Sequence, residues 1–225
     1  MPTEKTRQKI VTSFMSLLEE KTLQEVSFAD LSEKAGVGLD VLRASFDGRL
    51  AILKEFSSGI DQKVLSERDE DTLSEPPKDR LFDVLMLRID FLENHRGAMR
   101  NLNTSLNAAP SLVVPLNRIS TTAMSWMLTA ANIETTGLRR RAMSRALALG
   151  FGRVLRVWLE DEEEGRPKTL KAMEEMLSRG EFWMKKVDKL EFALRPLKKG
   201  FKRPHRPHTR HHHHEPKDET PVPAD

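Results

Sequence analysis

Apolar side chains recur every three to four residues along most of the chain, and this spacing limits what the chain can fold into. Near the N-terminus, the apolar residues that fall on one helical face are Ile10, Val11, Phe14, Leu17 and Leu18. Stretches in which polar residues alternate with β-branched ones, the pattern of a half-buried strand, are missing from the sequence. The sequence therefore predicts an all-α protein.

The residues that start and stop helices divide this pattern into separate elements. Ser27 can cap the amide of Asp30, and Gly36 can end the short helix that follows. Pro76 and Pro77 can open a later helix, because proline is tolerated in a first helical turn. The expected helices cover residues 3–20, 28–35, 39–45, 49–67, 76–94, 96–108, 111–133, 138–160 and 167–177, and continuation of the last one to residue 201 is left open.

The composition excludes several classes of protein. The 225 residues include no cysteine, so disulfides, thiolate nucleophiles and zinc–thiolate sites are ruled out. No run of about 18 apolar residues occurs, and the first residues carry charges where a signal peptide would be apolar. A glycine-rich phosphate loop and a catalytic constellation are also missing. We expect a cytoplasmic protein with no enzymatic activity, no cofactor and no metal.

Residues 196–225 differ in composition from the rest of the chain. They hold seven Lys/Arg and four Asp/Glu, which accounts for the whole net charge of +3, and six of the twelve prolines. Six of the seven histidines also lie there, and the four adjacent ones, His211 to His214, would form no defined metal geometry. We expect residues 196–225 to be a disordered tail, because they have too few apolar side chains to offset the entropy of ordering.

Residues 27–46 carry the most specific pattern in the chain. A short capped helix, a tight turn at Ala35-Gly36-Val37 and a second short helix make a helix-turn-helix, since glycine permits the left-handed turn between them. The second helix of such a motif presents its outer face to a DNA major groove.

The same residues resemble the N-terminal domain of TetR-family transcriptional regulators. The resemblance covers residues 7–56 and rests on Val26-Ser27 before the second helix, Gly36 at the turn, Leu42 and Phe46 in and after the third, and Leu50, Ile52 and Leu53 in the fourth. It implies a dimeric, all-α, ligand-responsive regulator, such as a repressor, that binds operator DNA as a homodimer. The domains would be a DNA-binding head at 1–60, a ligand-binding and dimerisation body at 61–195, and the tail.

The resemblance also implies a set of site residues. Leu39, Asp40, Arg43 and Ala44 would approach base edges, Arg49 would approach phosphate, and Ser27 and Gly38 would stand at the starts of the two helices. A small apolar ligand would bind among residues of the body: Phe82, Met86, Phe91, Met99, Met124, Trp126 and Met127. Residues 1–60 hold eight Lys/Arg and nine Asp/Glu, so a head that only packs and no longer reads DNA is the other interpretation of this motif.

A second function class depends on the C-terminal half. Trp158 to Asp161, with Thr169, Met173, Glu174 and Leu177, is similar to a stretch of the COQ9 family of ubiquinone-biosynthesis proteins, which implies a TetR-like fold that binds lipid. Residues 182–203 carry eight Lys/Arg and two Asp/Glu among apolar residues, and such helices can lie on anionic membranes. Under that alternative the head is vestigial. In the other interpretation, the helices that contain Trp158 and residues 169–177 pack together in the dimer interface, and Trp158 lies within that interface.

Overall fold

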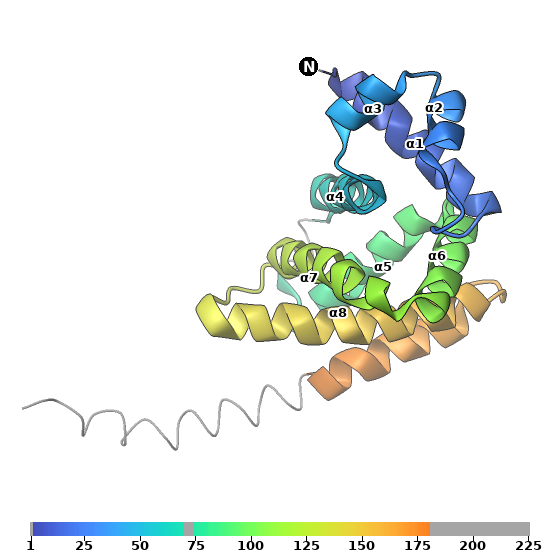
Figure 1. Ribbon diagram of the computed structural model, residues 1–225. Coiled ribbons are helices and arrows are strands. Elements are labelled where there is room, and N and C mark those ends of the chain that lie inside the picture. The colour runs from blue at the N-terminus through green and yellow to red at the C-terminus, as the bar shows by residue number, and fades with distance from the viewer. Residues whose placement is uncertain (1, 70–73, 181–225) are drawn as a thin grey trace, which may run out of the picture. The chain divides into compact units, whose positions relative to one another are not determined.

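The computed structural model describes residues 2–69 and 74–180, and every regular element in these two ranges is a helix (Figure 1). The all-α fold class is therefore confirmed for this part of the chain. No helix in these ranges is long and apolar enough to span a membrane. The predicted tail, residues 196–225, the basic segment 182–203 and the continuation of the last helix to residue 201 lie outside the described residues.

Three helices supply most of the head core: α1 (Glu4–Glu20), α2 (Phe28–Ala35) and α3 (Leu39–Ser45). The caps are those that the sequence indicates, because Ser27 Oγ accepts the amide of Asp30 at 3.0 Å and Gly36 ends α2 with φ 57° and ψ 43°. Thr3 caps α1 in the same way, by accepting the amide of Thr6. The core residues are Ile10, Val11, Phe14, Met15, Leu17, Leu18, Leu23, Val26, Leu31, Ala35, Leu42, Phe46, Ile52, Leu53 and Ala98.

The helix α4 (Arg49–Glu67) belongs to both halves of the molecule. Its first turns bury Ile52 and Leu53 in the head core, whereas Ile60 and Val64 are buried in a second core that lies in the body. A change in the position of α4 would therefore alter the packing of both the head core and the body core.

The body contains α5 (Pro77–Glu93), α6 (Arg96–Ala108), α7 (Val113–Ala130), α8 (Gly137–Glu160) and a last helix over residues 167–180, drawn in orange in Figure 1. Its core residues come mainly from α5, α7 and α8, and Trp158, Phe151, Met124 and Met127 are among its fully buried side chains. The side chain of Trp158 has 0% exposure within one chain, so the expectation that it lies in a dimer interface is wrong. A buried side chain offers a partner no surface.

The bounds of α7 differ from the expected helix at 111–133. Pro110–Leu112 form a 3-10 turn (η2), and the α-helix begins only at Val113, with Pro115 accommodated in its first turn. At the other end Asn132 has φ 51°, and the amide of Ile133 donates to the carbonyl of Leu128 at 2.9 Å. This left-handed cap stops the helix before Ile133.

Polar contacts join α6 to the head. Asn101 Nδ2 donates to the carbonyl of Leu18 at 2.9 Å, and Ser105 Oγ accepts the amide of Leu23 at 2.8 Å. Ala98 of the same helix is buried in the head core. The head is therefore held by α6 as well as by α4.

Candidate nucleic-acid interface and ligand cavity

The outer face of α3 collects the residues that the sequence assigns to base edges. All four are exposed to solvent on one short helix: Leu39, Asp40, Arg43 and Ala44. Leu42 and Ser45 are buried on the opposite face, and they fix which side of the helix points outward. Leu39 is 56% exposed.

The start of α3 is built around Gly38, which is its N-cap and offers no side-chain hydrogen bond. The carboxylate of Asp40 occupies the space that a Cβ at position 38 would need. Glycine at 38 and aspartate at 40 are thus compatible with each other, a pairing that the sequence alone did not indicate. Ser27, the other predicted residue at a helix start, is exposed and caps α2.

Arg43 is the basic side chain that α3 presents. Its Nη1 lies 2.7 Å from Asp47 Oδ1, with side-chain exposures of 73% for Arg43 and 91% for Asp47. An ion pair this exposed contributes little to stability. The guanidinium of Arg43 can therefore exchange Asp47 for another acceptor.

Several other bases of the head are already paired. Arg7 binds Glu55 at 2.7 Å and stacks 4.3 Å from the ring centre of Phe46, and Lys34 binds Glu20 at 2.9 Å. The hydrogen bond between Lys21 and Asp30, 2.8 Å long, raises the pKa of Lys21 and lowers the pKa of Asp30. These pairs reduce the positive charge that the head can offer to phosphate.

Three exposed lysines of the head have no ion pair with any described carboxylate: Lys5, Lys9 and Lys54. The ammonium of Lys9 lies 3.3 Å from the position that a Cβ on Gly36 would take, so it stands beside the turn of the helix-turn-helix. These lysines are the charges available for phosphate.

Arg49, which the sequence assigns to phosphate, makes internal contacts at the start of α4. Its Nη1 donates to the carbonyl oxygens of Leu23, Gln24 and Val26 at 2.8, 3.0 and 3.1 Å. Arg49 therefore fixes the connection between α1 and α2 against α4. Contact with phosphate stays a prediction.

A cavity of about 420 Å³ lies in the body and reaches α4, α6, α7 and α8. Most of its lining is apolar, with Leu53 and Phe56 from α4, Leu102 and Leu106 from α6, and further residues from α7 and α8. Both the size and the lining are typical of a small-molecule site.

Two of the seven residues that the sequence assigns to a ligand pocket, Met99 and Met124, line this cavity, and the other five do not. Phe82, Met86 and Phe91 lie on α5 and pack against the body core, Met127 is fully buried in that core, and Trp126 is 48% exposed. The physical reason is that α5 reaches the cavity only through Arg88 and Leu92. Seven polar lining residues escape prediction from the sequence, because polar side chains leave no mark in an apolar pattern: Ser57, Arg88, Asn103, Asn107, Asn117, Ser120 and Arg156.

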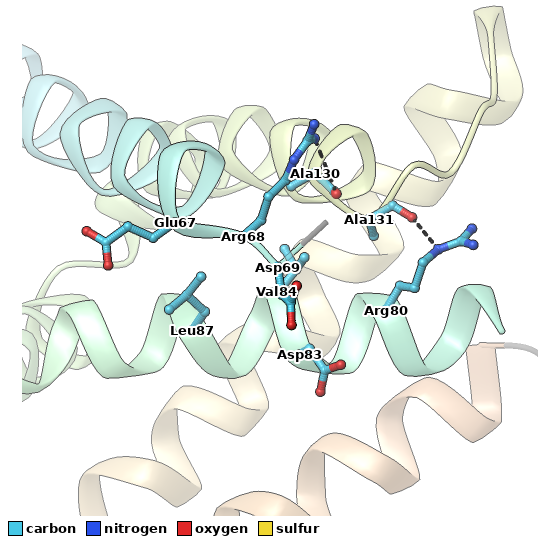
Figure 2. A pocket seen from close by; sticks show the side chains of 9 residues that line it. All are labelled: Glu67, Arg68, Asp69, Arg80, Asp83, Val84, Leu87, Ala130 and Ala131. Carbon is cyan, nitrogen blue, oxygen red and sulfur yellow. Dashed lines mark hydrogen bonds between the residues drawn. The ribbon is translucent and has the colours of Figure 1, made fainter. Parts of the chain in front are cut away.

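A smaller cavity of about 210 Å³ lies where α4, α5 and the end of α7 meet (Figure 2). Arg80 Nε donates to the carbonyl of Ala131 at 2.9 Å, and Arg68 Nη1 lies 3.5 Å from the carbonyl of Ala130. Figure 2 shows both arginines reaching the end of α7, with Asp83 on the α5 side. This cavity is lined by side chains that hold the end of α7 in place.

Comparison with known proteins identifies the fold. No protein-family model matches the sequence, and no curated protein matches it. The structure is similar to a TetR transcriptional regulator from a Rhodococcus species, with 20% identity, a TM-score of 0.58 and coverage of 78% of this chain and 95% of that one. A TetR transcriptional regulator from Nitrosomonas europaea matches with 18% identity, a TM-score of 0.62 and coverage of 80% and 99%. The chain has the TetR fold.

Proposed function

We propose that this protein is a TetR-type transcriptional regulator, a repressor that binds double-stranded operator DNA as a homodimer and responds to a small apolar ligand. Residues 1–60 bind DNA, and residues 61–195 bind ligand and dimerise. Its place of action is the cytoplasm.

The outer face of α3 is the observation that carries this proposal. Four neighbouring side chains point away from the head core with no described element covering them, and one of them, Arg43, can release its exposed partner Asp47. An arginine in a major groove can pair with the O6 and N7 atoms of guanine. The unpaired lysines Lys5, Lys9 and Lys54 supply the phosphate contacts.

The proposed response to ligand follows from the walls of the cavity. Leu53, Phe56 and Ser57 line it, and all three belong to α4, the helix that also enters the head core. A ligand that prefers one position of α4 would shift the population of head positions toward it. Two heads bind successive major grooves only when they are about 34–36 Å apart, so a shifted spacing releases DNA.

The proposed dimer uses α8 and the helix at 167–180. Each helix exposes a large apolar side chain that the described residues leave uncovered and that does not line the cavity: Leu138 at 82% on α8 and Leu170 at 37% on the last helix. A two-fold contact between copies would bury these side chains. The lipid-binding alternative depends on the stretch 158–177 and on residues 182–203, which lie outside the described residues, and neither similar structure named above supports it.

Selection of binding sequences from a random duplex library tests the proposal without knowledge of the operator. The selected duplex and a scrambled control are then titrated with protein in a fluorescence anisotropy assay at two salt concentrations. We expect a palindromic selected sequence, bound about 10³-fold or more tightly than the scrambled control. Equal affinity for the two duplexes would refute the DNA-binding function.

A further inference from the structure

One end of the larger cavity is open to solvent, and the other end is buried. Among its lining residues, Asn107, Val113, Leu149 and Arg156 are exposed, and they mark the mouth. Buried lining residues mark the interior: Leu53, Leu92, Met124, Ala148, Phe151, Trp158 and Leu159. A ligand that fills this cavity needs an apolar body and one end that faces water.

The charges around the cavity have one sign. None of the lining residues is an aspartate or a glutamate, and two are arginines. Arg88 is buried and neutralised, because Nη1 donates to the carboxylate of Asp61 and Nη2 lies 3.1 Å from Ser57 Oγ. Arg156 is exposed at the mouth, and no described carboxylate pairs with it.

The helix that carries Arg156 is itself rich in arginine. Within α8, residues 137–160 contain six arginines and a single acidic residue, Glu160. Charges that line a partly closed cleft attract ligands of the opposite sign. An ammonium group at the mouth would meet Arg156 with no carboxylate to offset the repulsion.

We propose that the cavity binds a free amphiphilic carboxylate, with its anionic group on Arg156 at the mouth and its apolar chain extending toward Phe56 and Leu53 of α4. A guanidinium suits this role because its planar donors match the two oxygens of a carboxylate. Asn107, also at the mouth, supplies a neutral donor. The regulatory consequence of this binding rests on the proposed function, whereas the binding itself does not.

Calorimetric titration of the full chain with decanoate, 1-decanol and decylammonium tests the proposal, because these probes share a chain and differ in charge. We expect decanoate to bind about tenfold or more tightly than decanol, and decylammonium to bind most weakly. Arg156→Gln should reduce decanoate binding to the level of decanol. The matched control is Arg153→Gln, an exposed arginine of the same helix that does not line the cavity, and it should change nothing.

A second variant tests whether the chain enters the cavity. Gly152 lines it, and a Cβ at this position would meet nothing within 4 Å, so Gly152→Leu narrows the cavity without a clash at Cβ. We expect this variant to bind decanoate and decanol more weakly than the wild type, by the same factor for both probes. Unchanged binding of both probes to this variant would overturn the cavity as the site.

Three results would overturn the choice of ligand class: no binding of decanoate, equal binding of decanoate and decanol, or equal losses in Arg156→Gln and Arg153→Gln. Binding of decanoate only when it is presented in anionic vesicles would overturn a free ligand in favour of a membrane. Duplex anisotropy on the same samples separates this inference from the proposed function. Decanoate binding that depends on Arg156 upholds the inference even if no DNA is bound.

Discussion

The guanidinium of Arg88 on α5 donates to the carboxylate of Asp61 on α4, and the two side chains have exposures of only 6% and 8%. Arg88 also contacts Ser57 on α4, so one side chain fixes two turns of this helix. Because Arg88 and Ser57 line the cavity of about 420 Å³, the pair joins the cavity wall to the helix that enters the head.

Asp61→Leu is expected to destabilise the protein by roughly 3–5 kcal/mol, because it leaves the Arg88 charge buried without a partner. The double variant Asp61→Leu with Arg88→Met removes both charges and should lose much less. Urea unfolding followed by circular dichroism measures both effects. Equal losses in the single and the double variant would mean that the buried charge of Arg88 carries no penalty once Asp61 is removed, which would contradict this account.

His95 is expected to make the fold sensitive to mild acid. Its ring lies edge-on to Phe56 with a centroid distance of 4.9 Å, and burial lowers its pKa, assisted by Lys63 and opposed by Glu19. The unfolded chain, whose histidine pKa is about 6.5, then binds more protons than the native state. The stability that His95 contributes is therefore full above about pH 6.5 and is lost as the pH falls toward the lowered pKa.

The measurement compares urea midpoints of the wild type and His95→Leu between about pH 7.5 and 5.5, a range that spans the unfolded pKa. His95 is the only histidine in residues 1–204, so the variant removes the titrating group that this region contributes. We expect the wild type to lose more stability than the variant over this range. Parallel losses would assign the acid sensitivity to carboxylates.

Trp158→Ala is expected to destabilise each chain rather than separate two chains. The indole is fully buried, its Nε1 donates to Glu93 at 3.0 Å, and Arg96 lies 5.1 Å from the ring centre. Loss of a buried tryptophan costs about 3–5 kcal/mol. Thermal unfolding should show a large drop for Trp158→Ala and almost none for Trp126→Ala, whose side chain is 48% exposed. A folded Trp158→Ala monomer with an unchanged melting temperature would contradict this account.

The dimer is expected to depend on the exposed apolar residues of its two helices. Light scattering should give the wild type twice the chain mass of 25.7 kDa. Leu170→Arg should shift the protein toward the monomer, because a charge in a dry contact is costly. Lys171→Ala, at the exposed neighbouring position, should leave the mass unchanged. A wild-type mass of one chain would exclude the homodimer.

Most helix bounds could be predicted because caps are local. Thr3, Ser27 and Gly36 act within three or four residues of themselves, and a sequence displays that range directly. The start of α7 could not be predicted, because a 3-10 turn and an α-helical turn share much the same spacing.

The candidate DNA interface and the cavity were harder to predict than the helices, because both depend on contacts between residues that are distant in the sequence. Arg7 pairs with Glu55, 48 positions away, and Arg49 donates to carbonyl oxygens of the α1–α2 connection. Neither arginine is therefore as available for phosphate as its place in the sequence indicates. Apolar periodicity shows that Met127 is inward but not whether it meets other side chains or a cavity. That distinction depends on how the helices pack.

The electrostatics of the head predict a modest dependence of DNA binding on salt. Lys9→Ala should weaken binding to all duplexes alike and flatten the logarithmic salt slope by about one unit, because one phosphate is then no longer neutralised. Glu33→Gln, which removes an exposed negative charge from α2, is the opposite test and should strengthen binding to every duplex. Anisotropy titrations at several salt concentrations give both slopes. A Lys9→Ala slope equal to that of the wild type would remove Lys9 from the interface.

The central claim, that the outer face of α3 reads base pairs, is tested most directly by Arg43→Ala on the selected duplex and on its single-base-pair variants. We expect a loss of about 1–3 kcal/mol on the selected duplex and a relaxed preference at one base pair in each half-site, with the other positions still discriminated. Identical affinities of wild type and Arg43→Ala across the whole set of duplexes would contradict the claim.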